Sequence, residues 1–345
     1  MTHTLTRAAL SLLSLIILAG AALAADPGPG ASPDATSEAS DQKAGSLLYY
    51  NAYTSDAASP TAANTRINIT NINQFTGVAV HLFFVNGSDC SIADNYICLT
   101  ANQTGSFLAT EMDPGSSGYI VAIASSSDGF PIQFNFLIGD EYVKYATGHA
   151  ANLGAVAFAK RNNANFLSPD GTLAQLFFDG LNLAGSYNRA PRVVALDNIP
   201  ARADGNDTLL ILNRVGGNLG IGAATLTGGG VGNLFGILYN DVETPYSFSF
   251  PAPVCQFRTN INNNFPRTAP RVENIIPATR SGWMKLYSLS DIGILGAMIN
   301  RAGSADAAPK AFGSGHNLHH LTLTTAANLV IPIFPSNCPE IQSPE

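Results

Sequence analysis

Apolar and polar residues alternate with a period of two through most of the chain. In the segment TRINITN at 65–71, the two isoleucines lie on one face, and the Arg, the first Asn and the second Thr lie on the other. This alternation is typical of a half-buried β-strand. The segment VAVHLFFV at 78–85 is instead largely apolar on both faces, as expected of a central strand that is covered on both sides. Clusters of Gly, Asn, Asp and Pro separate these runs, so the pattern predicts an all-β protein.

The pattern of strands and turns occurs twice. The segments SGYIVAIASSSDGFPIQFNFL at 117–137 and SGWMKLYSLSDIGILGAMI at 281–299 both run from Ser-Gly-aromatic through an apolar strand and a turn to a second apolar strand. Upstream of each lies a second matching pair, TRINITN and TLLILNR (208–214). Each copy holds six or seven predicted strands over about 100 residues, the size of an immunoglobulin-like sandwich. The sequence therefore predicts two tandem immunoglobulin-like β-sandwich domains from an internal duplication.

The two copies set the predicted domain boundaries. We expect β-sandwich domain 1 over 46–147, a linker over 148–189, and β-sandwich domain 2 with C-terminal strands over 190–338. No long segment has a period of 3.6 residues. The best helical candidate is the Ala-rich HAANLGAVAFAK at 149–160, so the linker is predicted to hold a short helix.

The first residues have the three parts of a secretory signal peptide. Arg7 precedes a short apolar run at 8–19, and Ala-Leu-Ala at 22–24 fits the cleavage rule, so 1–24 is predicted to be a signal peptide. Residues 25–45 contain almost no bulky side chains and are predicted to form a disordered leader. We therefore expect an exported protein, periplasmic, cell-surface or extracellular, with no integral membrane span in the mature chain.

The charge balance narrows the classes of partner. The chain has 17 Lys and Arg against 24 Asp and Glu, a net charge of −7, and only 12% of its residues are charged. An acidic surface without a basic cluster argues against nucleic acid as a partner. The Gly-rich run at 216–232 is followed by a predicted strand and not by a helix, which argues against a phosphate-binding loop. No cofactor is expected.

The four cysteines favour disulfides, because their number is even and the chain carries an export signal. Cys98 and Cys255 occupy equivalent places in the two copies. Cys90 lies eight residues before Cys98, a spacing suited to closing a loop or hairpin, which leaves Cys338 for Cys255. The predicted disulfides are therefore Cys90–Cys98 and Cys255–Cys338.

A cluster of histidines near the C-terminus is a weak metal candidate. On a strand, His316 and His320 share a face and His319 points the other way, whereas on a loop all three can converge. Zinc needs three or four ligands with a fixed geometry. No Cys and no pair of carboxylates is evident nearby, so the sequence favours ordinary surface histidines and no metal site.

A row of aromatic residues is the better binding candidate. In LLYYNAY, the side chains of Tyr49, Asn51 and Tyr53 are predicted to share one face of a strand, with Tyr50 on the other. Such a row can stack on sugar rings or contact another protein. The alternative is that it covers a sheet against domain 2 or the leader.

Four segments of the first copy carry a family resemblance. The block VHLFFVNGSDC, followed by CLTANQTGSF, DPGSSGYIVAIA and FNFLIGDEYV, resembles a family of uncharacterised exported bacterial proteins over most of 46–338. The resemblance implies export and a tandem β fold. It implies no activity and no site residue.

These observations lead to two hypotheses of function. The chain has no Gly-x-Ser-x-Gly elbow and few ionisable residues, so we lean against an enzyme. The first hypothesis is a non-catalytic tandem β-sandwich protein for adhesion, matrix or cell-envelope interaction, whose partner is an envelope protein or a glycan. The alternative is a carbohydrate-binding or carbohydrate-active exported protein, for which a flat aromatic strip on the surface would be the sign.

Overall fold

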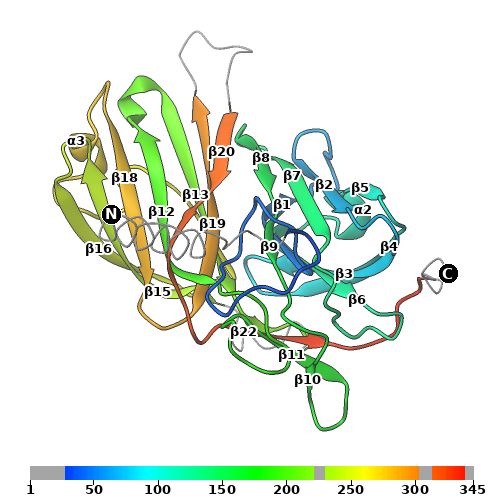
Figure 1. Ribbon diagram of the computed structural model, residues 1–345. Helices are drawn as coiled ribbons and strands as arrows, with labels where there is room; N and C mark the ends of the chain where they lie inside the picture. Colours follow the sequence, from blue (N-terminus) through cyan, green and yellow to red (C-terminus); the bar gives the residue numbers. More distant parts are fainter. Residues whose placement is uncertain (1–27, 221–229, 303–312, 339–345) are drawn as a thin grey trace, which may run out of the picture.

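The computed structural model describes residues 28–220, 230–302 and 313–338 (Figure 1). These residues form an all-β protein whose sheets are antiparallel except for one parallel pair of strands, with two single-turn helices, α2 (Ala109–Met112) and α3 (Val272–Ile275), and the 3-10 helix η1 (Arg202–Asp204). The predicted signal peptide, 1–24, lies outside the described residues.

Two sheets from the N-terminal half pack face to face. One has the strand order β4-β3-β6-β1-β9 and the other β5-β2-β7-β8. Their strands are β1 (Leu47–Thr54), β2 (Asn64–Asn71), β3 (Val78–Asn86), β4 (Ile92–Leu99), β5 (Thr104–Leu108), β6 (Ser117–Ser125), β7 (Leu137–Lys144), β8 (Ala150–Gly154) and β9 (Val156–Phe158). We call this pair of sheets the first sandwich.

Two further sheets form the second sandwich, beside the first (Figure 1). One has the order β16-β15-β18-β12-β21 and the other β17-β13-β19-β20. Their strands are β12 (Pro191–Pro200), β13 (Asn206–Val215), β15 (Gly232–Asn240), β16 (Pro245–Ala252), β17 (Gln256–Asn260), β18 (Ser281–Ser288), β19 (Gly293–Ala302), β20 (Gly313–Asn317) and β21 (His319–Leu323).

The matching sequence segments occupy matching places in these sheets. TRINITN lies on β2 and TLLILNR on β13, each the second strand of its four-stranded sheet. SGYIVAI lies on β6 and SGWMKLY on β18, each the central strand of its five-stranded sheet. Both central strands pair with a bulged strand, β1 or β12, in the same register relative to the Ser-Gly pair.

A fifth, small sheet covers one face of the first sandwich. Its order is β10-β11-β22-β14. Its strands are β10 (Phe166–Leu167), β11 (Leu173–Phe177), β14 (Gly217–Asn218) and β22 (Asn328–Pro332). The linker thus contributes strands, and the helix predicted within 149–160 is wrong. Ala-rich HAANLGAVAFAK instead forms β8 and β9, in which Ala151 and Leu153 alternate into one apolar cluster and Val156 and Phe158 into another.

The covering sheet explains the apolar pattern of β3. Leu82 and Phe84 point into the core between the two sheets of the first sandwich, whereas Phe83 and Val85 point into a second core under the small sheet. Leu176 of β11 belongs to that second core. The prediction that VAVHLFFV is a central strand covered on both sides is therefore confirmed.

The two sandwiches share a further apolar cluster. It contains Val143 and Leu153 from β7 and β8, packed with Leu209, Ile211 and Ile299 from β13 and β19. These residues of β13 face away from their own core, to which Leu210 and Leu212 contribute. Alternate residues of β13 thus pack into the core of the second sandwich and against the first sandwich.

The predicted disordered leader is wrong for residues 28–45. The backbone of Ala39 donates to Arg189, and Ser40 exchanges backbone hydrogen bonds with Ala157 at 2.8 and 3.1 Å. Ala39 is buried in the core under the small sheet. Gly45 lies so close to the backbone of Phe158 that a Cβ atom would clash with it. The small side chains that suggest disorder are the ones that allow this close approach.

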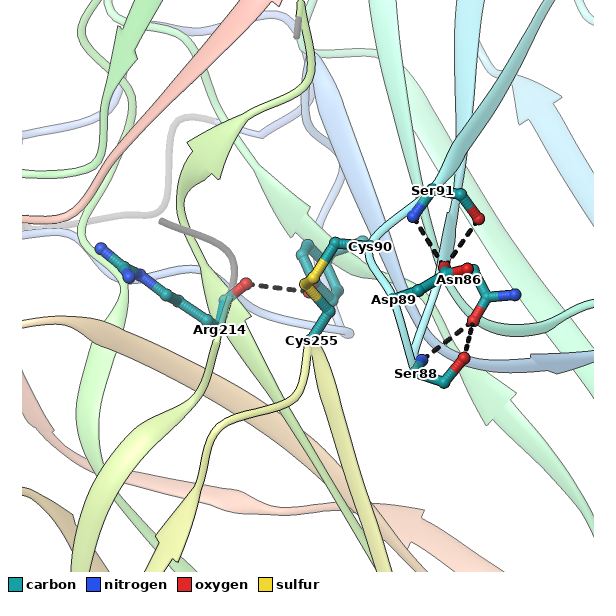
Figure 2. Close-up of a disulfide and its surroundings, with 8 residues drawn as sticks. Asn86, Ser88, Asp89, Cys90, Ser91, Arg214 and Cys255 are labelled. Carbon is teal, nitrogen blue, oxygen red and sulfur yellow. Dashed lines mark hydrogen bonds between the residues drawn. A yellow bond between two sulfur atoms is a disulfide. The ribbon is translucent and has the colours of Figure 1, made fainter. Parts of the chain in front are cut away.

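The predicted disulfide pairs are also wrong. The bonds join Cys90 to Cys255 and Cys98 to Cys338, with 5.5 Å between the Cα atoms in each pair. Cys90 lies in the β3–β4 turn and Cys98 near the far end of β4, and an extended strand of this length separates them by about 20 Å. Figure 2 shows the first bond linking this turn to the start of β17. One disulfide therefore joins the two sandwiches, and the other fastens the tail after β22 to the first sandwich.

A buried carboxyl group lies beside the bulge of β1. Glu141 is fully buried on β7, and its Oε1 accepts a hydrogen bond of 3.0 Å from the Ala52 amide, which the bulge removes from the strand ladder. Its Oε2 has no hydrogen-bond partner among the described residues. Burial raises the pKa of Glu141 well above its usual value, with a smaller contribution from Asp140, so the carboxyl group is protonated over a wider pH range when folded.

We expect Glu141→Gln to stabilise the protein at alkaline pH. The folded state binds the Glu141 proton more tightly than the unfolded chain, so this contribution to stability is full below about pH 4.5 and falls as pH rises toward the folded pKa. Glutamine resembles the protonated acid but does not titrate, so it removes this dependence of stability on pH. Urea unfolding should give a gain of about 1–3 kcal/mol at pH 8 and little change at pH 4. Exposed Glu273→Gln is the matched control, and an equal gain from it would contradict the prediction.

Candidate functional site

The predicted aromatic row is not an exposed site. Tyr49, Asn51 and Tyr53 are buried, with 2%, 0% and 0% of their surface exposed. Tyr49 lies in the core under the small sheet, and its hydroxyl donates to the Arg214 carbonyl at 3.1 Å. Tyr53 lies in the other core, with Tyr50, and donates to Asp113 at 2.6 Å. The covering role against the second half of the chain thus holds for Tyr49 and Asn51, whereas Tyr53 lies in the core of the first sandwich itself.

A β-bulge explains why Tyr49 and Tyr53 face opposite ways. The pairing of β1 with β6 shifts between Tyr50 and Tyr53, so the alternation of faces changes within the row. β12 has the same bulge against β18, between Leu196 and Ile199. The bulged pair is Asn51 and Ala52 in β1, and Asp197 and Asn198 in β12.

The bulge of β1 holds a buried polar network between the two sandwiches. The Asn51 carbonyl accepts hydrogen bonds from Asn213 and Gln256 at 2.9 and 3.0 Å, and its side-chain amide donates to Asn317 at 2.8 Å. Gln256 also donates to the Gly118 carbonyl at 2.8 Å. Because each of these groups is buried or half-buried, the network fixes the relative position of the two halves.

A group of half-buried aromatic side chains lies elsewhere, on the outer face of β15 and β18. Along β18, Met284 and Leu286 point into the core of the second sandwich. The alternate residues Trp283, Lys285 and Tyr287 point outward and are half-buried. β15 alternates in the same way. We define the open face as the six outward residues Phe235, Ile237, Tyr239, Trp283, Lys285 and Tyr287.

The side chains of the open face form cross-strand pairs. Tyr239 and Trp283 stack with 4.1 Å between ring centroids and 7° between ring planes. Phe235 and Tyr287 pair at 5.9 Å. The Lys285 ammonium group lies 5.1 Å from the Trp283 ring centroid and 5.9 Å from that of Tyr239. The face therefore combines flat aromatic area with one cation held by cation–π contacts.

The equivalent face of the first sandwich is closed. By the registers of β6 and β18, Trp283, Lys285 and Tyr287 correspond to Tyr119, Val121 and Ile123. Those three residues are buried in the core under the small sheet, with the side chains of Leu176 and Ile331. The small sheet thus covers one of two equivalent faces, and among the described residues no sheet covers the other.

The histidines of the C-terminal cluster do not share one strand. β20 ends at Asn317 and β21 begins at His319, and the two strands belong to different sheets of the second sandwich. The change of sheet at Leu318 places His316 and His319 on the same side, both beside Asp197. His320 is separated from them; its pKa is lowered by burial, against the opposing effect of Glu38. The arrangement thus differs from both that the sequence left open, one strand or one loop, because the three histidines are divided between two strands.

No helix among the residues described is both long and apolar enough to cross a membrane.

Comparisons with known proteins add little to this description. No protein-family model matches the chain, and no curated protein matches it. A solved structure from Thermotoga maritima, titled "Crystal Structure of Thermotoga maritima 1070", is similar to 35% of this chain and to 98% of its own length. The sequence identity is 6% and the TM-score 0.26, a level at which the similarity identifies neither fold nor function.

Proposed function

We propose that this is an exported, non-catalytic interaction protein that binds a partner of the cell envelope or matrix through the open face of its second sandwich. The observation that carries the proposal is the difference between two equivalent faces. The small sheet covers the first, whereas the second exposes a cluster of aromatic side chains and one lysine. Contiguous apolar surface of this kind is typical of binding sites, and Trp and Tyr are the residues most often dominant there.

The proposal includes an origin for the architecture. We infer two tandem immunoglobulin-like sandwiches that arose by internal duplication, over about the first and second halves of the mature chain. The support is that the nine strands β1–β9 and nine strands of the second sandwich follow the same order in their sheets, with a bulge at the same place. The two disulfides are in keeping with an exported protein.

The chemistry of the open face favours a protein partner. Sugar binding by aromatic residues requires a free ring face, and here the Tyr239 and Trp283 rings lie against each other with Lys285 over Trp283. A partner with apolar side chains and a carboxylate would complement this surface, since the carboxylate would pair with Lys285. Carbohydrate binding remains the alternative function, favoured by the presence of a Trp and two Tyr on one half-buried sheet face.

We expect Trp283→Ala to weaken binding to the isolated cell envelope by about 30-fold, because a central aromatic residue commonly contributes 2 kcal/mol or more. Lys285→Glu should weaken it as well, since it replaces attraction by repulsion. Phe75→Ala is the matched control, because Phe75 is 70% exposed on the first sandwich. Binding is measured by co-sedimentation, with thermal unfolding to show that each variant is folded.

Two results would contradict the proposal. If Trp283→Ala and Phe75→Ala bind equally well, the open face is not the contact surface. If purified polysaccharide competes for binding and protease treatment of the envelope has no effect, the carbohydrate alternative replaces the protein partner.

A further inference from the structure

Three side chains with metal-binding atoms converge at one edge of the second sandwich. His316 Nε2 lies 2.9 Å from one oxygen of Asp197, and His319 Nε2 lies 3.3 Å from the other. The three potential ligand atoms all lie within 4.8 Å of one another. Asp197 comes from the bulge of β12, and the two histidines flank the point where the chain passes from β20 to β21.

His316 Nε2 faces Asp197, and the hydrogen bond of the other ring nitrogen, Nδ1, determines whether Nε2 has a lone pair to offer. His316 Nδ1 lies 2.8 Å from the Asn317 carbonyl oxygen, which only accepts, so Nδ1 carries a proton. In the neutral imidazole, Nε2 is then an acceptor. It faces a carboxylate oxygen, also an acceptor, at 2.9 Å. A metal ion bound between them would be coordinated by both lone pairs, a position that a proton occupies when no metal is bound.

The same three backbone positions of the first sandwich show that the fold does not require these residues. By the registers of β1 with β9 and of β12 with β21, Val156 corresponds to His319. Counting back along each chain, Leu153 corresponds to His316, and the bulge residue Asn51 corresponds to Asp197. None of these three offers a carboxylate or an imidazole. The ligand set is therefore a property of the second sandwich and not of the shared fold.

We infer that Asp197, His316 and His319 bind one divalent metal ion such as Zn²⁺. Two imidazoles and one carboxylate suit Zn²⁺, with water in the remaining position of a tetrahedron. The Asn317 carbonyl orients His316 in the manner common to metal-bound histidines. Because the side chains of His316, His319 and Asp197 are 36%, 57% and 58% exposed, respectively, the ion can enter from solvent.

The test is titration of the purified, chelator-treated protein with ZnCl2, followed by calorimetry and by the midpoint of thermal unfolding. We expect one ion per chain and a higher unfolding midpoint with zinc. His316→Ala and His319→Ala should each weaken binding by about tenfold or more. Asp197→Asn, which preserves the shape of the bulge residue, should do the same. His320→Gln is the matched control and should bind as the unsubstituted protein does.

Two outcomes would overturn the inference. One is the absence of saturable zinc binding, together with NMR showing His316 protonated on both nitrogens at neutral pH, which would show that a proton occupies the position between His316 and Asp197. The other is binding that survives in the double variant His316→Ala/His319→Ala.

Discussion

Removing the disulfide between Cys98 and Cys338 is expected to lower the free energy of unfolding more than any other change considered. The bond closes a loop with a sequence separation of 240 residues. Chain-entropy arguments give about 5 kcal/mol for a loop of this size, as an upper value. The structural reason is that the bond holds the tail after β22, and β22 is a central strand of the small sheet that covers the first sandwich. Loss of that cover would expose Tyr119 and Val121.

The measurement is denaturant unfolding of Cys98→Ser/Cys338→Ser, followed by the fluorescence of Trp283, the single tryptophan. Cys90→Ser/Cys255→Ser is the companion variant, with a separation of 165 residues and a similar expected loss. Mass spectrometry of non-reduced peptides checks the pairing itself. Peptides that join Cys90 to Cys98 would contradict the pairing and the destabilisation predicted from it.

After the loss of either disulfide, Gln256→Leu is expected to have the largest effect. Gln256 is 4% exposed, and its amide nitrogen lies within hydrogen-bond distance of the Asn51 and Gly118 carbonyls and of the Asn213 side chain. Leucine has a similar volume but no donor. The substitution leaves these acceptors short of a partner where the two sandwiches meet, which we expect to cost about 2–4 kcal/mol.

The matched control is the same substitution at an exposed site, Gln103→Leu, whose side chain accepts two hydrogen bonds from Thr100. It should change the unfolding free energy by less than about 1 kcal/mol. Equal losses from the two variants would show that the network does not hold the sandwiches together.

Sequence reasoning identified the strands well where one rule governs a segment. TRINITN and TLLILNR both form strands, at the same place in their four-stranded sheets. VAVHLFFV is apolar on both faces because two different layers cover it. In each case the local pattern and the tertiary environment agree.

The predictions failed where a single residue breaks the regular pattern. The bulge at Asn51 and Ala52 reverses the faces of the Tyr row, and no propensity in LLYYNAY indicates a bulge. The change of sheet at Leu318 regroups the histidines, and only the other strands determine where it occurs. The cysteine pairing depends on how the two sandwiches and the tail meet, which spacing along the chain does not encode.

One signal for the open face was present in the sequence. In the matched segments SGYIVAI and SGWMKLY, Val121 corresponds to Lys285. A lysine at an alternate position of an otherwise apolar strand indicates that this face meets solvent, whereas valine indicates cover. β15 carries no such lysine, because its outward residues Phe235, Ile237 and Tyr239 are all apolar or aromatic. Its sequence therefore does not indicate that this face differs from that of the first sandwich.

The central claim is that the open face of the second sandwich is the contact surface. Hydroxyl-radical footprinting of the protein, alone and with its isolated cell envelope, tests this claim most directly. We expect Trp283, Tyr239 and Tyr287 to be oxidised in the free protein and protected in the presence of envelope, while Phe75 reacts equally in both and Tyr119 in neither. Protection of Phe75 with unchanged oxidation of Trp283 and its neighbours would contradict it.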